Sequence, residues 1–215
     1  MGTTSQKRLV RRLDLERALQ SVGTHPSPKA SLEQYTIPVD VASEMLFLAA
    51  YVHDDIMGKT VADLGCGTGR LAIGAALLGA RQSVGVDIDK PSVKLAKDCS
   101  VRLNLQGRSD WIVGDISVLR AQFDTILQNP PFGVQKRRAD RKFLVTALEL
   151  ASRVYSLHKG GESNRAFIKS LIERHGARVT GMYSMKLNIP RLFKFHTKSR
   201  HEVDVDLYRI ESGGN

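Results

Sequence analysis

Short β-rich runs alternate with helical stretches from Thr60 onward, and this alternation limits the possible folds more than any other feature of the chain. It is typical of an α/β domain built on a doubly wound sheet. The expected strands are Thr60–Leu64, Gln82–Asp87, Ser109–Val113, Phe123–Leu127, Val154–His158, Ala177–Tyr183 and Val203–Ile210. The expected helices are Gly69–Leu78, Pro91–Leu105, Ala139–Ala151 and Ser163–His175. No helix of useful length separates the last two strands. We therefore predict a Rossmann-like, seven-stranded sheet with helices on both faces and an antiparallel last strand.

The length of 215 residues suits one such domain with a sizeable core and is too short for two. We expect a single domain over residues 1–215, made of an N-terminal helical extension at 1–58 and a core at 59–215. In the extension, apolar residues at helical spacing predict helices over Gln6–Val22 and Pro38–Val52. The segment between them contains Pro26 and Pro28, so we expect it to be extended.

Positive charge is in excess and is clustered. The chain has 32 basic and 22 acidic side chains, which gives a formal net charge of +10. One cluster consists of Lys136, Arg137, Arg138, Arg141 and Lys142. The other is an acid-free stretch between Glu173 and Glu202 that contains Arg174, Arg178, Lys186, Arg191, Lys194, Lys198 and Arg200. Two such blocks favour a polyanionic partner such as RNA over a merely solvated surface.

Other features indicate the compartment and argue against a metal site. The basic N-terminus leads into Leu13–Glu16 instead of the apolar run of a secretory signal, and no segment suits a membrane span. The two cysteines, Cys66 and Cys99, cannot form a disulfide framework, so we expect a cytoplasmic protein. Cys and His residues do not have the spacing of zinc ligands, and no metal site is predicted.

The glycine-rich motif Val61–Arg70 runs from the first expected strand into the start of a helix, as a cofactor-binding loop requires, with Asp63 just before the loop. Its glycines, Gly65, Gly67 and Gly69, let the backbone turn sharply and approach a ligand closely. The spacing differs from that of dinucleotide sites, which also place a pyrophosphate at the helix N-terminus. The Asp63 carboxylate would repel a pyrophosphate but suits the cationic amino group of a methionine moiety.

An acidic residue also ends the second expected strand, and another follows the third. Asp87 can accept hydrogen bonds from both hydroxyls of a ribose. Asp115 could accept from the amino group of an adenine, or it could simply cap a turn, and the sequence leaves both roles open. Ile88 and Ile116 would then flank the adenine ring. Together with the glycine loop, these residues predict an S-adenosylmethionine site.

The most specific motif is Asn129-Pro130-Pro131-Phe132, directly after the fourth expected strand. An amino nitrogen conjugated to a ring or carbonyl is a poor nucleophile. The Asn129 side-chain oxygen and the Pro130 carbonyl can accept both of its N–H groups and stabilise the charge that develops as methyl leaves a sulfonium. The prolines keep these acceptors rigid. Phe132 offers a face for a flat base, in a contact that typically contributes about 1–3 kcal/mol.

These motifs resemble those of known families. Asp63–Gly67, Val86–Asp89 and Asn129–Gly133 resemble the class I amino-methyltransferases. More narrowly, Leu32–Tyr35 and two further segments resemble the archaeal and eukaryotic family of methyltransferase-like protein five, which N6-methylates an adenosine in small-subunit ribosomal RNA. The further segments are Val154–Lys159 and Lys194–His196. The similarity extends from about Lys7 to Ile210, and this chain looks like an archaeal-type member.

The resemblance implies a set of cofactor contacts in which residues of the N-terminal segment close over the cofactor. The predicted cofactor-binding residues are Gln34, Tyr35, Thr36, Asp63, Gly65, Gly67, Thr68, Gly69, Arg70, Asp87, Ile88, Asp115 and Ile116. The predicted RNA-binding residues are Lys136, Arg137, Arg138, Arg191, Lys194, Phe195, His196 and Lys198. Eukaryotic members differ from this chain at Ile37, Thr68 and Arg70, so we expect contacts at those positions through the backbone.

The family resemblance also implies a small zinc-binding activator protein as a partner. The strand Ser109–Val113 is expected at the sheet edge and contains Trp111, the only tryptophan. An exposed apolar edge could pair with a strand of such a partner. Alternatively, Trp111 packs under a neighbouring helix. The sequence favours neither arrangement.

Two other functions remain open at this point. Asn-Pro-Pro followed by an aromatic residue also suits guanine N2 or a protein glutamine amide as the methyl acceptor. A non-catalytic RNA-binding or ribosome-assembly module could have inherited the same fold. The presence of Asp63, Asp87 and Asn129 together favours an enzyme over the latter.

Overall fold

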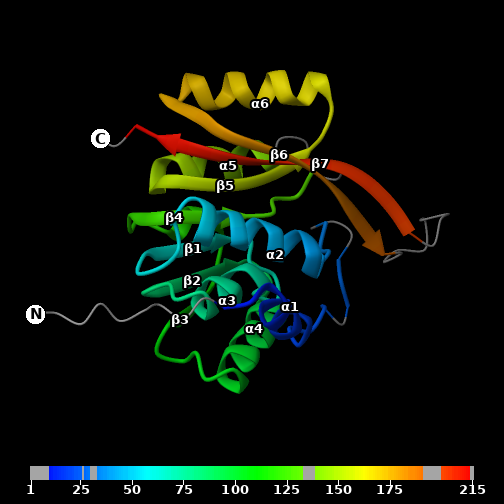
Figure 1. Ribbon diagram of the computed structural model, residues 1–215, viewed down its shortest axis with the longest axis vertical. Coiled ribbons are helices and arrows are strands. Elements are labelled where there is room, and N and C mark those ends of the chain that lie inside the picture. The colour runs from blue at the N-terminus through cyan, green and yellow to red at the C-terminus, as the bar shows by residue number, and fades with distance from the viewer. Residues whose placement is uncertain (1–9, 26, 30–32, 133–138, 191–199, 214–215) are drawn as a thin grey trace, which may run out of the picture.

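The computed structural model describes residues 10–25, 27–29, 33–132, 139–190 and 200–213. Its centre is one seven-stranded sheet in the order β3-β2-β1-β4-β5-β7-β6, which Figure 1 shows from β6 at the top to β3 at the bottom. The first five strands run parallel, and β7 lies antiparallel between β5 and β6. The predicted fold class is confirmed. The strands are β1 Thr60–Leu64, β2 Gln82–Asp87, β3 Ser109–Val113, β4 Phe123–Gln128, β5 Ala151–Lys159, β6 Ala177–Pro190 and β7 Arg200–Ser212.

Helices cover both faces of this sheet. One side carries the N-terminal helices together with α3 and α4, and the other carries α5 and α6. The helices are α1 Arg12–Gln20, α2 Val39–Phe47, α3 Arg70–Leu77, α4 Lys90–Arg102, α5 Ala139–Leu150 and α6 Glu162–Arg174. A π-helical turn, Leu48–Val52, continues α2, and a 3₁₀ turn, Ile116–Val118, follows β3. Across the described parts of the chain, none of these helices combines the length and the apolar character needed to cross a lipid bilayer.

The C-terminal hairpin is longer than the sequence predicted. Its cross-strand pairs continue from Tyr183↔Leu207 outward to Pro190↔Arg200, so that β6 and β7 extend beyond the rest of the sheet (Figure 1). Leu187 and Val205, on one face of the extension, are buried in the same apolar cluster as the N-terminal helices. Burial against a segment far away in sequence therefore stabilises the extra strand length.

The N-terminal extension packs closely onto the sheet-containing core. Leu15 and Leu19 of α1 are fully buried, as are Met45 and Leu46 of α2. They share a cluster with apolar residues of β1, α3 and β5. A Cβ on Gly74 would lie 2.2 Å from a Leu46 methyl carbon, so the close approach of α2 to α3 requires a glycine there. This packing brings the segment between α1 and α2 to the carboxyl ends of the parallel strands.

Candidate active site

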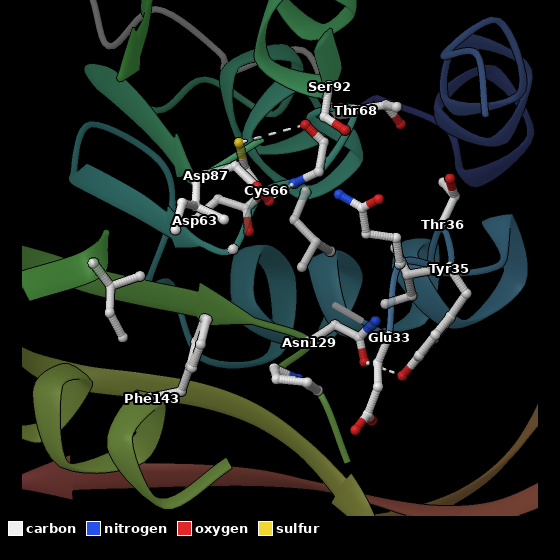
Figure 2. Close-up of a pocket in the computed structure, with 18 of the residues that line it drawn as sticks. Glu33, Tyr35, Thr36, Asp63, Cys66, Thr68, Asp87, Ser92, Asn129 and Phe143 are labelled. Carbon is white, nitrogen blue, oxygen red and sulfur yellow. Dashed lines mark hydrogen bonds between the residues drawn. The ribbon is translucent and has the colours of Figure 1, made fainter. Parts of the chain in front are cut away.

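A pocket of about 380 Å³ lies at the carboxyl ends of β1, β2 and β4, where ligands of doubly wound sheets bind. Several parts of the chain meet there, among them the glycine loop, the end of β2, the loops after β3 and β4, α5 and the N-terminal segment (Figure 2). Of the predicted cofactor-binding residues, the pocket lining contains Gln34, Tyr35, Thr36, Asp63, Gly65, Gly67, Thr68, Arg70, Asp87, Ile88, Asp115 and Ile116. Gly69 is not part of the lining. The fold thus brings together residues that are distant in sequence.

Two carboxylates hold the glycine loop and the helix α3 that follows it. The backbone at Gly67 has a φ of +51°, a left-handed conformation that favours glycine. Its N–H donates to Asp87 Oδ2 at 2.8 Å. Asp63 lies under the loop and accepts from the backbone N–H of Ala72 at 3.0 Å. Burial raises the pKa of Asp63 to about 7, so the site favours a cationic neighbour for this carboxylate.

The end of β2 supplies a second polar surface. Asp87 also accepts from the Asp89 backbone N–H at 2.8 Å, and burial raises the pKa of its carboxyl group. Ile88, next to it, is 59% exposed, whereas Ile116 on the other side of the pocket is buried. The buried side chain of Ile116 and the exposed side chain of Ile88 are suited to contact the two faces of a flat ring.

Asp115 caps the 3₁₀ turn, which is one of the two roles that the sequence left open for this residue. Its side chain accepts from the Ser117 backbone N–H at 2.9 Å and pairs with Lys142 Nζ at 2.6 Å. Lys142 is the main reason why the pKa of Asp115 falls to about 2. Because Asp115 and Lys142 both line the pocket, the capping role does not remove the carboxylate from the site.

The N-terminal strap, which we define as residues 21–38 in their described parts, is fastened across the pocket by polar contacts. His25 Nε2 and Lys29 Nζ each lie 2.9 Å from the buried carboxylate of Asp89. Asp89 also caps α4 by accepting from Ser92. Burial would raise the pKa of Asp89, but the donors of Lys29, Ser92 and His25 outweigh it and hold the pKa well below its usual range.

Arg70 has a structural role in addition to its predicted place in the pocket. Its guanidinium is buried and donates to the backbone carbonyls of Ile37 and Val22, the latter at 3.1 Å. Arg70 therefore contributes to the pocket lining while its charged end clamps two points of the strap. The sequence contained no local signal for this role, because both acceptors are backbone atoms about 30 or more residues away.

Thr68 has an unsatisfied hydroxyl group. The side chain is buried, and its Oγ1 has no hydrogen-bond partner among the described residues. A buried hydroxyl without a partner is costly, and one that belongs to a pocket lining is a natural contact for a polar ligand atom. This position thus fits a ligand with hydrogen-bonding groups, such as a nucleoside.

The loop after β4 presents Asn129 and Pro131 to the pocket. The Tyr35 hydroxyl of the strap donates to Asn129 Oδ1 at 3.1 Å, and Figure 2 shows the two side chains pointing toward one another. The rings of Tyr35 and Phe132 lie 5.8 Å apart at an angle of 42°. Burial raises the pKa of Tyr35 far above its ordinary value, so its phenol keeps the proton that it donates. The strap and the candidate catalytic loop are therefore directly connected.

Nine lining residues are not among the site residues predicted from sequence: His25, Glu33, Ile37, Cys66, Leu71, Ser92, Gly114, Lys142 and Phe143. Phe143 lies so close to the glycine loop that a Cβ on Gly65 would be 2.8 Å from its ring. His25 and Phe143 come from the strap and from α5, whose positions only the folded chain reveals. The spacing of Ser92 from Asp89 is that of a helix cap, and this is the one signal that could have indicated its place.

Some predicted residues cannot be placed. The RNA-binding candidates Lys136, Arg137, Arg138, Arg191, Lys194, Phe195, His196 and Lys198 lie outside the described residues. Among the residues that are described, His, Cys, Asp and Glu do not gather in any group that could hold a metal ion.

Trp111 packs under α4, which resolves the two arrangements that the sequence left open. Its Nε1 donates to Ser100 Oγ of α4 at 3.1 Å. Its ring lies so near the backbone of Gly69 and Gly85 that a Cβ at either position would be 2.5 Å away. Strand β3 is an edge of the sheet as predicted, but Trp111 does not make that edge apolar.

The strand order and this pocket define a class I methyltransferase: a glycine loop follows β1, a carboxylate ends β2, and Asn-Pro-Pro-Phe follows β4. Residues 36–165 match the family model of the methyltransferase small domain, and the chain belongs to this family.

Known proteins resemble the chain over nearly its whole length. The rRNA N(6)-adenosine-methyltransferase Mettl5 of Drosophila melanogaster is 39% identical over 206 residues, which cover 93% of this chain and 95% of the relative. The rRNA N(6)-adenosine-methyltransferase METTL5 of Danio rerio is 37% identical over 203 residues, which cover 92% of this chain and 97% of the relative. The crystal structure of PH1948 from Pyrococcus horikoshii, described as a candidate RNA methyltransferase, superposes with a TM-score of 0.88 at 40% identity. It covers 95% of this chain and 98% of that one.

Proposed function

We propose that this protein transfers a methyl group from S-adenosylmethionine to the N6 amino group of an adenosine in RNA, namely small-subunit ribosomal RNA. The observation that carries the proposal is the position of Asn129, whose amide oxygen lies at the pocket and is held there by Tyr35. Relatives that span almost the same length are named rRNA N6-adenosine methyltransferases, which supports the choice of acceptor. An rRNA substrate also agrees with a cytoplasmic location.

The residues of the pocket fit S-adenosylmethionine, which supplies an electrophilic methyl group on a sulfonium. Asp63 would hold the cationic amino group, because a neighbouring positive charge relieves the cost of ionising this buried carboxyl. Asp87 would accept from the ribose hydroxyls. Ile88 and Ile116 would contact the faces of the adenine. The unpaired hydroxyl of Thr68 would gain a partner. The strap, with Gln34 to Thr36, would act as the lid.

Asn129 provides the chemistry that the acceptor requires. Its Oδ1 and the Pro130 carbonyl accept the two N–H groups of the target amine, which favours a pyramidal nitrogen with its lone pair free. Tyr35 donates to the same Oδ1, so it fixes which end of the Asn129 amide faces the acceptor. The nitrogen loses its proton easily once it carries a fourth bond, so a strong general base is unnecessary. Alignment of the amine is then the main contribution of the protein.

We further propose that a small zinc-binding activator binds at the edge strand β3. Because Trp111 is turned inward, the apolar groups that remain there are Val113, which is 51% exposed, and Val118, which is 52% exposed. Within the described residues β3 has a strand neighbour on one side only, and this edge with two exposed valines nearby suits strand addition by a partner.

The decisive experiment is mass spectrometry of nucleosides from RNA incubated with the protein and methyl-labelled S-adenosylmethionine. We expect label in N6-methyladenosine. Asn129→Ala should lower the rate by about 100- to 1000-fold, the usual effect of removing one preorganised hydrogen-bonding group, with cofactor affinity nearly unchanged in calorimetry. Gln122→Ala, which removes an exposed amide bonded to the Glu149 carbonyl, is the control and should retain full activity.

Other outcomes would overturn the proposal. Label in N2-methylguanosine, or only in protein, would change the acceptor. A protein that binds RNA but no S-adenosylmethionine would be a non-catalytic module. Full activity of Asn129→Ala would remove the motif from the mechanism.

A further inference from the structure

A second cavity lies beside the candidate catalytic loop. We call it the flanking hollow; its volume is about 540 Å³. It is bounded by Phe132, Asp140, the segment 158–164 from the end of β5 to the first turn of α6, and Phe167 of α6. Asn129 and Pro131 line the cofactor pocket, whereas Phe132, the next residue, lines this hollow. The catalytic loop therefore forms the boundary between the two cavities.

Aromatic side chains give the flanking hollow an apolar surface. Phe132 is half-buried, and Phe167 is 40% exposed. The motif already predicted that Phe132 offers a face to a base. Phe167 belongs to no motif, and the buried side of α6 consists of Ile168, Leu171 and Ile172, so Phe167 is not needed for the core. Aromatic rings in an open hollow are the usual platforms for unstacked bases of single-stranded RNA.

A buried histidine adds a hydrogen-bond donor. His158 lines the hollow although only 1% of it is exposed, and burial lowers its pKa to about 4, so the ring is neutral. Gln128 Nε2 donates a hydrogen bond to Ser156 Oγ at 2.8 Å. The Ser156 hydroxyl can then donate its own proton to His158 Nε2, which lies 2.7 Å away. The imidazole proton is then on Nδ1, which has no partner among the described residues.

Acidic groups in the described part of the lining suit an amino-bearing ligand. Asp140 and the exposed Glu162 are carboxylates, which accept from amino groups and repel phosphates. Lys159 is the one cation among the described lining residues and is exposed. The hollow thus offers flat apolar contacts, an N–H donor and carboxylate acceptors, a combination that suits a nucleobase with an amino group and a ring nitrogen or carbonyl.

We infer that the flanking hollow binds the base of the nucleotide adjacent to the target adenosine in single-stranded RNA, with a preference for an amino-bearing base such as cytosine. This inference rests on the proposed function, because Asn129 must hold the target amine at the cofactor pocket. The base one step along the strand then meets Phe167 and His158, with Phe132, which the motif assigns to the target base, between the two bases. The hydrogen-bonded chain from His158 through Ser156 to Gln128 connects this base to the residue that precedes Asn129.

The test uses a short single-stranded RNA with one adenosine at its centre and cytidines elsewhere. Phe167→Ala should weaken binding, measured by fluorescence anisotropy, by about 5- to 50-fold, as expected when one base loses its stacking partner. KM for the RNA should rise similarly with little change in kcat. Phe167→Trp should retain wild-type affinity. Met182→Ala on β6 is the matched control, because Met182 is 45% exposed against 40% for Phe167 and lies outside the hollow.

Modified RNAs identify the nucleotide. An abasic residue on one side of the adenosine should weaken wild-type binding and abolish the difference between wild type and Phe167→Ala. Uridine at that position should also bind more weakly than cytidine. If Phe167→Ala binds as tightly as Met182→Ala, or if abasic residues on both sides leave the difference intact, the inference is wrong. These binding results are independent of the methylation assay. If the protein methylates RNA but Phe167→Ala binds RNA as tightly as wild type, only the inference about the flanking hollow is refuted. Binding defects without any methylation would refute the proposed activity and leave only base binding by the hollow.

Discussion

The hydroxyl of Tyr35 provides the sharpest test of how the strap contributes to catalysis. Tyr35→Phe removes the donor to Asn129 Oδ1 while leaving the ring that packs beside Phe132. A neutral hydrogen bond contributes about 0.5–1.5 kcal/mol net. If that contribution serves to orient the Asn129 amide in the transition state, kcat should fall by about twofold to tenfold.

The assay is steady-state methyl transfer to RNA with the cofactor and the RNA varied separately. We expect the loss in kcat, with KM for S-adenosylmethionine nearly constant, because the remaining contacts of the strap persist. Tyr51→Phe is the matched control. Tyr51 also bonds the N-terminal segment, at the Val10 backbone N–H, but it does not touch the catalytic loop. An unchanged kcat in Tyr35→Phe would refute the reasoning, and an increase would show that the hydroxyl competes with the substrate for Oδ1.

The remaining predictions concern the carboxylate under the glycine loop and the clamp on the strap. The pKa of Asp63 lies near 7 instead of 3.8, so the folded protein binds more protons than the unfolded chain between these values, and the contribution of Asp63 to stability falls as pH rises from about 4 to 7. Asp63→Asn should flatten this dependence in denaturant unfolding, and a decline as steep as in wild type would mean that Asp63 ionises normally. Arg70→Met removes both donors to the strap and should lower the free energy of unfolding by about 2–4 kcal/mol, with faster protease cleavage of the strap. The exposed Arg81→Met is the control, and equal cleavage in both variants would contradict the clamp.

Strand positions followed from local sequence where neighbours in the chain decide them. Thr60–Leu64, Gln82–Asp87 and Ser109–Val113 have the predicted bounds because each is a short run between turn residues. The hairpin was predicted too short because pairing between its own strands, with burial of Leu187 and Val205 against the N-terminal helices, extends it. Such contacts join residues that no sequence window contains.

In the site too, local sequence predicted some residues, whereas others are placed only by contacts between distant parts of the chain. Asp63, Asp87 and Asn129 could be predicted because each follows or ends a parallel strand, and those ends meet at one edge of the sheet. Phe143 and the connection from Tyr35 to Asn129 depend on how α5 and the strap are placed across the pocket. The clamp by Arg70 could not be predicted either, because its acceptors at Ile37 and Val22 are distant in sequence.

The position of the only tryptophan has a practical consequence. Trp111 lies against Gly69 at the end of the glycine loop and against Gly85 of β2, the strand that ends at Asp87. Indole emission responds to small changes in polarity and packing, so this single fluorophore should report movement of the loop without any label. Stopped-flow fluorescence of the native chain could then time the arrival of the cofactor separately from every later step.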